Sequence, residues 1–395
     1  MKHPKSLLWL VIAYAAVVSA HTGIVKEPPP YRVVTGAARN IVQGINPYAP
    51  DPQLDFFKYS PLAALLMLPF TPLPDAVGTF LFLLLTSLLF IWGLVRWAQA
   101  VGYPLERSIP MQWIACLSVL LDATLGIQVG QWNVGIFALM LLGAAQYAEG
   151  KFARSGLVLA FGTNIKLFPF TLGLCLLTGL KKRYWGAFFG GLALWFLLPS
   201  LVVGPSNNFR LLAQWYRLMR WDVTRGQDPM VDIATFLARH FGSSEFIRTP
   251  LAVLVGLLIG AATCYLFREG EDRLLHRFLL PINGLYVVLF SYLSESATSV
   301  VATSGILLIG MEALEDQRNR RLYLLLWVIS LVLIPAFYSD LVAYEMSQWA
   351  RGFHLKTVGY LYTTVVVAVL FWKHRSGAPA AEATDAPSGS LPGKR

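Results

Sequence analysis

The sequence is short of the residues that keep a protein soluble in water. Only 14% of its 395 residues are charged, and its mean hydropathy is +0.56. Water-soluble domains carry about a quarter charged residues, most of them on the surface. This composition excludes a water-soluble fold and predicts a protein whose surface lies largely in lipid.

The sequence also lacks the signatures of disulfide-rich proteins, metal sites and the common soluble enzymes. The cysteines Cys116, Cys175 and Cys264 lie within apolar runs and have no paired spacing, which indicates core packing. The histidines are dispersed, and the chain has neither a phosphate-binding glycine loop nor a nucleophile elbow. We therefore expect no metal and no cofactor.

The formal net charge of +10 does not indicate nucleic-acid binding, because the basic residues form short clusters between apolar segments. Clusters of this kind mark the cytoplasmic ends of membrane helices. They are Arg96, Lys151 with Arg154, residues 181–183, 268–277 and 318–321, and Lys373 with Arg375. They predict a multi-pass protein of the cell membrane with both termini in the cytoplasm.

Apolar runs of about 17 to 20 residues recur along the chain, and this is the length that a helix needs to cross roughly 30 Å of hydrocarbon. We predict one all-α membrane domain over residues 1–375 with about 12 transmembrane helices. Their ranges are 6–25, 77–97, 109–126, 132–148, 155–164, 167–180, 184–203, 249–267, 277–294, 297–312, 322–338 and 357–373. Residues 376–395 are poor in apolar side chains and predict a disordered cytoplasmic tail.

Two of these helices, 155–164 and 167–180, lie between basic clusters and are too short for two ordinary crossings. Asn164, Lys166 and Pro169 mark the break between them. A polar break at membrane depth is tolerated only where it is buried in protein or lines a wet cavity. Lys166 therefore marks either a binding site or an ion pair.

The alternating topology leaves two longer segments outside, residues 26–75 and 204–248, so we expect the active face to be extracytoplasmic. The apolar run 59–70 is too short to span and predicts a re-entrant or interfacial helix. The second segment mixes aromatic residues with arginines, as interfacial helices do. Arg220 in this segment either binds phosphate or anchors the helix at lipid headgroups.

Other polar residues also have a structural and a functional interpretation. Asp51, Asp55 and Lys58 form either a solvated turn or a site in which a carboxylate acts as general base. Gln131 and Asn133 either cap helices or bind a hydroxyl-rich ligand. Glu295 is either solvated between two helices or faces a cavity.

Several motifs together resemble glycosyltransferase family 87 (DUF2029-type), most strongly over residues 30–200. They are Gly44-Ile45-Asn46-Pro47-Tyr48, Lys58-Tyr59-Ser60-Pro61-Leu62, Gly130-Gln131-Trp132-Asn133, and Ile165-Lys166 with Pro169. The resemblance implies a membrane mannosyltransferase-like protein of the GT-C superfamily. Such an enzyme takes a hexose, typically mannose, from a polyprenyl-phosphate carrier and transfers it to an extracytoplasmic lipid or glycan acceptor.

The resemblance also implies roles for particular residues. Lys166, Gln131 and Asn133 would line the cavity, with Lys166 at the phosphate of the donor. The family usually has an Asp shortly before the Gly44 segment, which is absent here, as is a late His near Ser294. The predicted base is therefore Glu27, Asp51 or Asp55, and the predicted substrate-binding residues are Lys58, Tyr59, Gln131, Asn133, Lys166, Arg220 and Glu295.

Two other functions stay open. A transporter or flippase also uses broken helices and an intramembrane lysine, but it needs gates on both faces, and here the long polar segments lie only outside. The missing Asp leaves room for a non-catalytic relative of the family.

Overall fold

The computed structural model describes residues 6–26, 28–49, 55–225, 231–242, 248–291, 294–339 and 342–376. These residues form helices and turns and contain no strand, which confirms the all-α prediction. Two predicted site residues, Glu27 and Asp51, lie outside the described residues. So does nearly all of the predicted tail, residues 377–395.

Every predicted membrane helix is present. Nine helices in the described part of the chain are long and apolar enough to cross a membrane, and α6, α7 and α8 are shorter. The twelve predicted positions correspond to α1 (Ser6–His21) with the π-helical η1 (Thr22–Lys26), α4 (Asp75–Ala100), α5 (Ile109–Val129), α6 (Asn133–Ala148), α7 (Phe152–Ile165), α8 (Phe168–Leu177), α9 (Lys182–Leu197) with α10 (Ser200–Val203), α13 (Arg248–Arg268), α14 (Asp272–Phe290), the 3-10 helix η5 (Ser296–Ala302) with α15 (Thr303–Glu315), α16 (Arg320–Leu333) with η6 (Ala336–Tyr338), and α18 (Leu355–Ser376). The protein is a multi-pass membrane protein.

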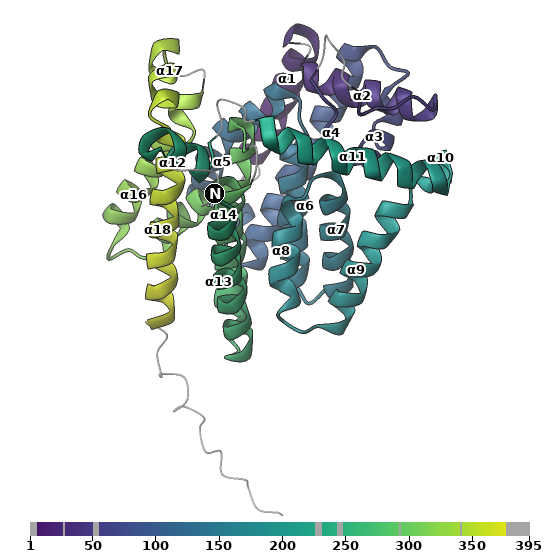
Figure 1. Ribbon diagram of the computed structural model, residues 1–395. Helices are drawn as coiled ribbons and strands as arrows, with labels where there is room; N and C mark the ends of the chain where they lie inside the picture. The colour runs from purple at the N-terminus through teal and green to yellow at the C-terminus, as the bar shows by residue number, and fades with distance from the viewer. Residues whose placement is uncertain are drawn as a thin grey trace, which may run out of the picture.

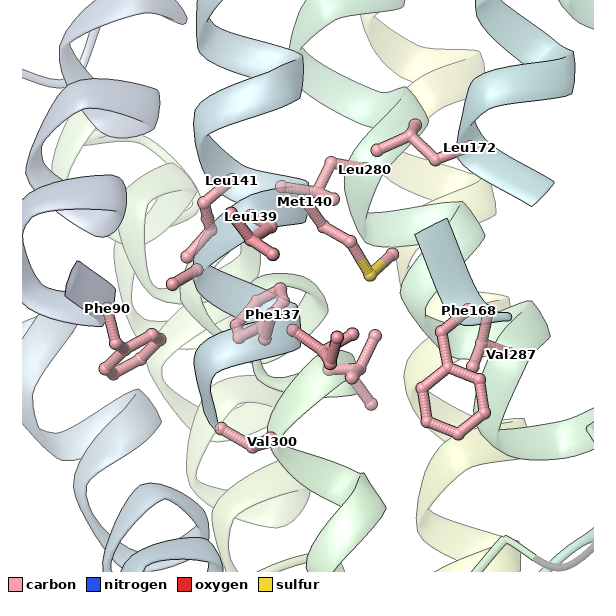
Figure 2. Packing of buried hydrophobic residues seen from close by; sticks show 14 of the residues in the cluster. Phe90, Phe137, Leu139, Met140, Leu141, Phe168, Leu172, Leu280, Val287 and Val300 are labelled. Carbon is pink, nitrogen blue, oxygen red and sulfur yellow. The ribbon is translucent and has the colours of Figure 1, made fainter. Parts of the chain in front are cut away.

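Helix α6 lies at the centre of the bundle. Figure 2 shows its side chains, among them Phe137, between Phe90 of α4 on one side and Leu280 and Val287 of α14 on the other. Almost all of its residues are buried. A helix that is apolar on all faces is stable only when protein or lipid surrounds it, and here protein does.

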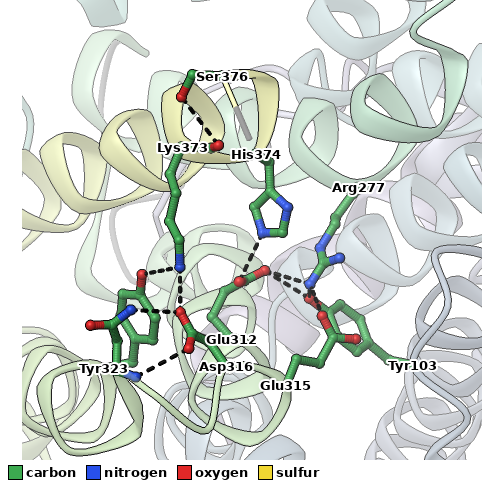
Figure 3. A network of polar contacts seen from close by, with 10 residues as sticks. Tyr103, Arg277, Glu312, Glu315, Asp316, Tyr323, Lys373, His374 and Ser376 are labelled. Atoms are coloured by element: carbon green, nitrogen blue, oxygen red, sulfur yellow. Dashed lines mark hydrogen bonds and ion pairs between the residues drawn. The ribbon is translucent and has the colours of Figure 1, made fainter. Parts of the chain in front are cut away.

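Several helix ends that are predicted to face the cytoplasm meet in one polar network (Figure 3). Arg277, near the start of α14, contacts Tyr103 from the turn between α4 and α5 and Glu312 from the end of α15. The last turn of α18 joins them through His374, whose Nε2 lies 2.8 Å from Glu312 Oε2. These ends lie together as the alternating topology requires.

A layer of shorter helices covers the other end. It consists of α2 (Pro29–Val42), α3 (Pro61–Leu65) with η2 (Leu68–Phe70), α11 (Pro205–Arg225), α12 (Ile233–Phe241) and α17 (Tyr344–Gly352). Figure 1 shows α11 running across the end of the bundle, while α13 and α18 run along it. Helices are present at both predicted places, α3 with η2 at residues 59–70 and α11 in the second outer segment. The helices α2, α12 and α17 were not predicted, because short amphipathic helices leave no continuous apolar run.

Two single cysteines test which end faces the cell exterior. In a variant without the native Cys116, Cys175 and Cys264, we introduce one new cysteine at a time, either Ser206→Cys on α11 or Gln317→Cys in the turn after α15. Both positions are exposed. We expect a membrane-impermeant maleimide to label Ser206→Cys in intact cells and Gln317→Cys only after permeabilisation, because basic turns stay in the cytoplasm. The reverse pattern would contradict the predicted orientation.

Candidate active site

A cavity of about 470 Å³ lies at the end of the bundle that α11 covers. Segments far apart in the sequence form its walls, and most of the lining side chains are apolar. The lining residues are Pro30, Val33, Asp55, Phe56, Lys58, Tyr59, Gln131, Ile165, Lys166, Leu167, Phe168, Thr171, Trp215, Met219, Tyr286, Val287, Phe290, Ser291 and Glu295. An apolar cavity with a few converging polar groups is the usual form of a ligand site.

A row of hydrogen bonds connects four of the predicted residues along the wall of this cavity. Lys166 Nζ donates to Asn133 Oδ1 at 2.7 Å, and Asn133 Nδ2 donates to Gln131 Oε1 at 2.8 Å. Gln131 Nε2 then donates to Glu295 Oε2 at 2.8 Å. Each amide accepts on one side and donates on the other, so this row, the Lys166–Glu295 network, links an ammonium group to a carboxylate.

The local backbone explains how the central part of this network is built. Gly130 ends α5 with φ at +72°, a conformation that glycine adopts without steric cost, so that Asn133 already begins α6. A Cβ at Gly130 would also lie 2.6 Å from Pro28. The Trp132 ring packs edge-on against Phe82 with 4.9 Å between the ring centroids, which anchors the turn.

The break between α7 and α8 places Lys166. Its backbone is extended, with φ −147° and ψ 138°, which ends α7. Pro169 lies in the first turn of α8, where its missing N–H breaks no helical hydrogen bond. The Lys166 ammonium lies 4.5 Å from the centroid of the Phe168 ring, a cation–π contact.

A second charged group lies where the outer segment meets α11. Lys58 Nζ is 3.3 Å from Asp222 Oδ2 and 3.6 Å from Asp55 Oδ2. Asp222 is fully buried, whereas the Asp55 side chain is 63% exposed and lines the cavity. Trp215 Nε1 donates to the Lys58 carbonyl at 3.1 Å, so α11 holds the segment that carries Asp55.

Comparison with known proteins decides the family. The profile of glycosyltransferase family 87 matches residues 56–292, more than half of the chain, a range that includes Lys58, Gln131, Asn133 and Lys166. The chain belongs to glycosyltransferase family 87. It is thus a multi-pass membrane protein of a glycosyltransferase family.

This family 87 protein is also similar to two fungal proteins, both named GPI mannosyltransferase 1. It is 27% identical to the protein of Emericella nidulans over 180 residues, which are 44% of this chain and 39% of the relative. It is 29% identical to the protein of Aspergillus fumigatus over 171 residues, 42% of this chain and 38% of the relative. The similarity thus spans less than half the length of these relatives, and no solved structure matches the chain.

Tyr59 completes the polar part of the cavity. Burial raises the pKa of its phenol well above the usual value, and the nearby carboxylates of Glu295 and Asp55 raise it further. Tyr59 therefore stays a neutral phenol, which can donate a hydrogen bond to a ligand. Tyr48 from the Gly44 motif donates its hydroxyl to the Tyr59 carbonyl at 3.2 Å, so the motif supports the cavity wall.

Not every predicted site residue lines the cavity. Asn133, which was predicted to line it, is fully buried and contacts Lys166 and Gln131 without being part of the cavity wall. Arg220 lies on the exposed face of α11 and is not part of the wall either. Glu27 and Asp51 lie outside the described residues, so Asp55 is the predicted base that the structure places at the cavity.

The sequence did not point to Asp222 or to the apolar wall. An Asp between arginines is typical of a solvated ion pair, and no local pattern shows that Asp222 is buried against Lys58. Tyr286 and Phe290, near the end of α14, line the cavity but resemble ordinary core residues of a membrane helix in the sequence. In the described residues, no three His, Cys, Asp or Glu are placed to hold a metal ion.

Proposed function

We propose that this family 87 transferase moves mannose from a polyprenyl-phosphate carrier to a lipid or glycan acceptor. The observation that carries the proposal is the meeting of a lysine ammonium, two carboxylates and an apolar wall in one cavity. The donor has matching parts, since it combines a phosphate, a hydroxyl-rich sugar and a hydrocarbon chain. The printed names of the two fungal relatives support mannose as the sugar.

The proposed reaction needs a base and a group that stabilises the leaving phosphate. The Asp55 carboxylate takes the proton of the acceptor hydroxyl, and the acceptor oxygen then attacks C1 of the sugar. The bond between C1 and the phosphate oxygen breaks, and the polyprenyl phosphate leaves with the electron pair. The Lys166 ammonium stabilises the charge of that phosphate in a cavity with mostly apolar walls.

The other cavity residues bind and orient the donor. Gln131 and Glu295 offer amide and carboxylate groups to the sugar hydroxyls, while Asn133 holds Lys166. The aromatic and aliphatic wall, including Trp215, Tyr286 and Phe290, contacts the first part of the polyprenyl chain. Lys58 keeps Asp55 next to the cavity, and the reaction uses no cofactor.

We place the reaction on the extracytoplasmic face of the cell membrane, with both termini in the cytoplasm. Tyr286 and Phe290 near the end of α14 line the cavity, whereas Arg277 near its start belongs to the network that joins helix ends with basic clusters, so the two lie at opposite ends of the bundle. Positively charged turns of membrane proteins stay in the cytoplasm, which supports this orientation.

The experiment that tests the function uses the purified protein in nanodiscs. Radiolabelled polyprenyl-phosphate mannose is offered with a pool of membrane lipids and glycans, and binding of the donor is measured in parallel. We expect radiolabel to pass to an acceptor. Binding without transfer would favour a carrier or an inactive relative, and the absence of both would contradict the proposed donor.

A further inference from the structure

Glu295 lies beyond the family match, which ends at residue 292, and its position depends on a part of the chain that no motif marks. It directly precedes η5, and its carbonyl accepts a hydrogen bond from the Thr298 N–H at 2.9 Å. No regular helix contains Glu295 itself. Gln131 binds the carboxylate directly, and contacts to the neighbours Ser294 and Ser296 determine where the backbone of Glu295 lies.

A buried ion pair holds the residue that follows Glu295. Lys356 of α18 and Asp122 of α5 have side-chain exposures of 0% and 1%, and Lys356 Nζ lies 3.0 Å from Asp122 Oδ1. Lys356 Nζ also donates to the Ser296 carbonyl at 3.2 Å. The same Asp122 oxygen accepts a hydrogen bond from Ser299 Oγ in η5 at 2.5 Å.

The next residue of α18 holds the residue that precedes Glu295. Thr357 Oγ1 donates to the Val231 carbonyl at 2.8 Å, and the Val231 N–H donates to the Ser294 carbonyl at 2.9 Å. The start of α18 thus reaches both sides of Glu295, through Lys356 on one side and through Thr357 and Val231 on the other.

A buried ion pair is an expensive way to stabilise a fold, because removing two charges from water offsets most of their attraction. Well-packed apolar side chains in the same place often give equal or greater stability. We propose that Lys356, Asp122 and Thr357 are positioning residues that fix Glu295 for donor binding. The inference rests on the role of Glu295 in the proposed function.

The first test compares two buried threonines of α18. Thr357→Val removes the hydrogen bond to Val231, and the matched control Thr363→Val removes a hydrogen bond to Ser330 Oγ, 3.1 Å long. We expect Thr357→Val to raise the Kd for polyprenyl-phosphate mannose roughly three- to tenfold, the effect of about one hydrogen bond, and Thr363→Val to leave it within about twofold. Equal effects in the two variants would overturn the proposal.

The second test removes the ion pair without leaving a lone buried charge. Lys356→Met combined with Asp122→Asn is expected to raise the donor Kd roughly ten- to thirtyfold, because the contacts to Ser296 and to Ser299 are both weakened. The melting temperature reports whether the protein has stayed folded. An unchanged donor Kd in the folded double variant would contradict the positioning role.

A third measurement shows whether Thr357 acts through Glu295. In a Glu295→Ala background, Thr357→Val should no longer raise the donor Kd, since the carboxylate to be positioned is absent. The same increase in both backgrounds would overturn the proposal. Unchanged donor binding in Glu295→Ala alone would contradict both the role of Glu295 and the proposed positioning of it. It would not contradict the proposed transfer reaction.

Hydrogen exchange gives a readout that needs no donor. We expect the amides of residues 294–302 to exchange faster in Thr357→Val than in Thr363→Val, because Val231, whose N–H donates to the Ser294 carbonyl, has lost its hydrogen bond to α18. Equal exchange would overturn the proposal even if the donor were a different molecule.

Discussion

Lys166→Met is expected to weaken binding of polyprenyl-phosphate mannose by about 2–4 kcal/mol, which is roughly 30- to 1,000-fold in Kd. Methionine has a similar length and no charge, so the change removes the ammonium that we propose binds the donor phosphate. In addition, it leaves Asn133 Oδ1 without the hydrogen bond that Lys166 now donates. Equilibrium binding of radiolabelled donor to the protein in nanodiscs measures the effect.

The control for this variant is Lys373→Met at the other end of the bundle. Lys373 also forms hydrogen bonds, to Asp316 and to Tyr323 (Figure 3), and it does not line the cavity. We expect its removal to leave the donor Kd unchanged. If Lys166→Met bound the donor as tightly as the wild type, Lys166 would not contact the phosphate.

Asp55→Asn is expected to lower kcat about 100- to 10,000-fold while leaving the donor Kd nearly unchanged. An amide cannot accept the proton of the acceptor hydroxyl, and a general base contributes rate factors of about this size. Asp55 is suited to this role because it lines the cavity and most of its side chain is accessible to an incoming acceptor. Initial rates of mannose transfer at saturating donor measure the loss.

Asp75→Asn is the matched control for Asp55. Asp75 also belongs to an ion pair in the outer layer, 3.3 Å from Arg32 Nε, and it does not line the cavity. Partly exposed pairs of this kind contribute little to stability, so we expect kcat to stay within about twofold. Full turnover of Asp55→Asn would shift the base to Glu27 or Asp51, the other two predicted carboxylates.

The outer layer shows where reasoning from the sequence was incomplete. The helix α11 could be predicted because aromatic residues alternate with arginines, but the burial of Asp222 on its inner face could not. The burial of Asp222 follows from the docking of α11 on the segment of Lys58, which lies more than 150 residues earlier in the chain. The predicted role of Arg220 stays a prediction, and its exposed position fits the alternative interpretation as a headgroup anchor.

The sequence by itself determined the class of the protein, the positions of the membrane helices and the family, because apolar length, basic turns and short motifs are properties of neighbouring residues. Only the tertiary structure decided which polar groups meet. Gln131 and Glu295 are 164 residues apart, and Asp122 and Lys356 are 234 residues apart, yet both pairs are in direct contact. Such contacts depend on how the helices pack and turn relative to one another, which no local pattern in the sequence records.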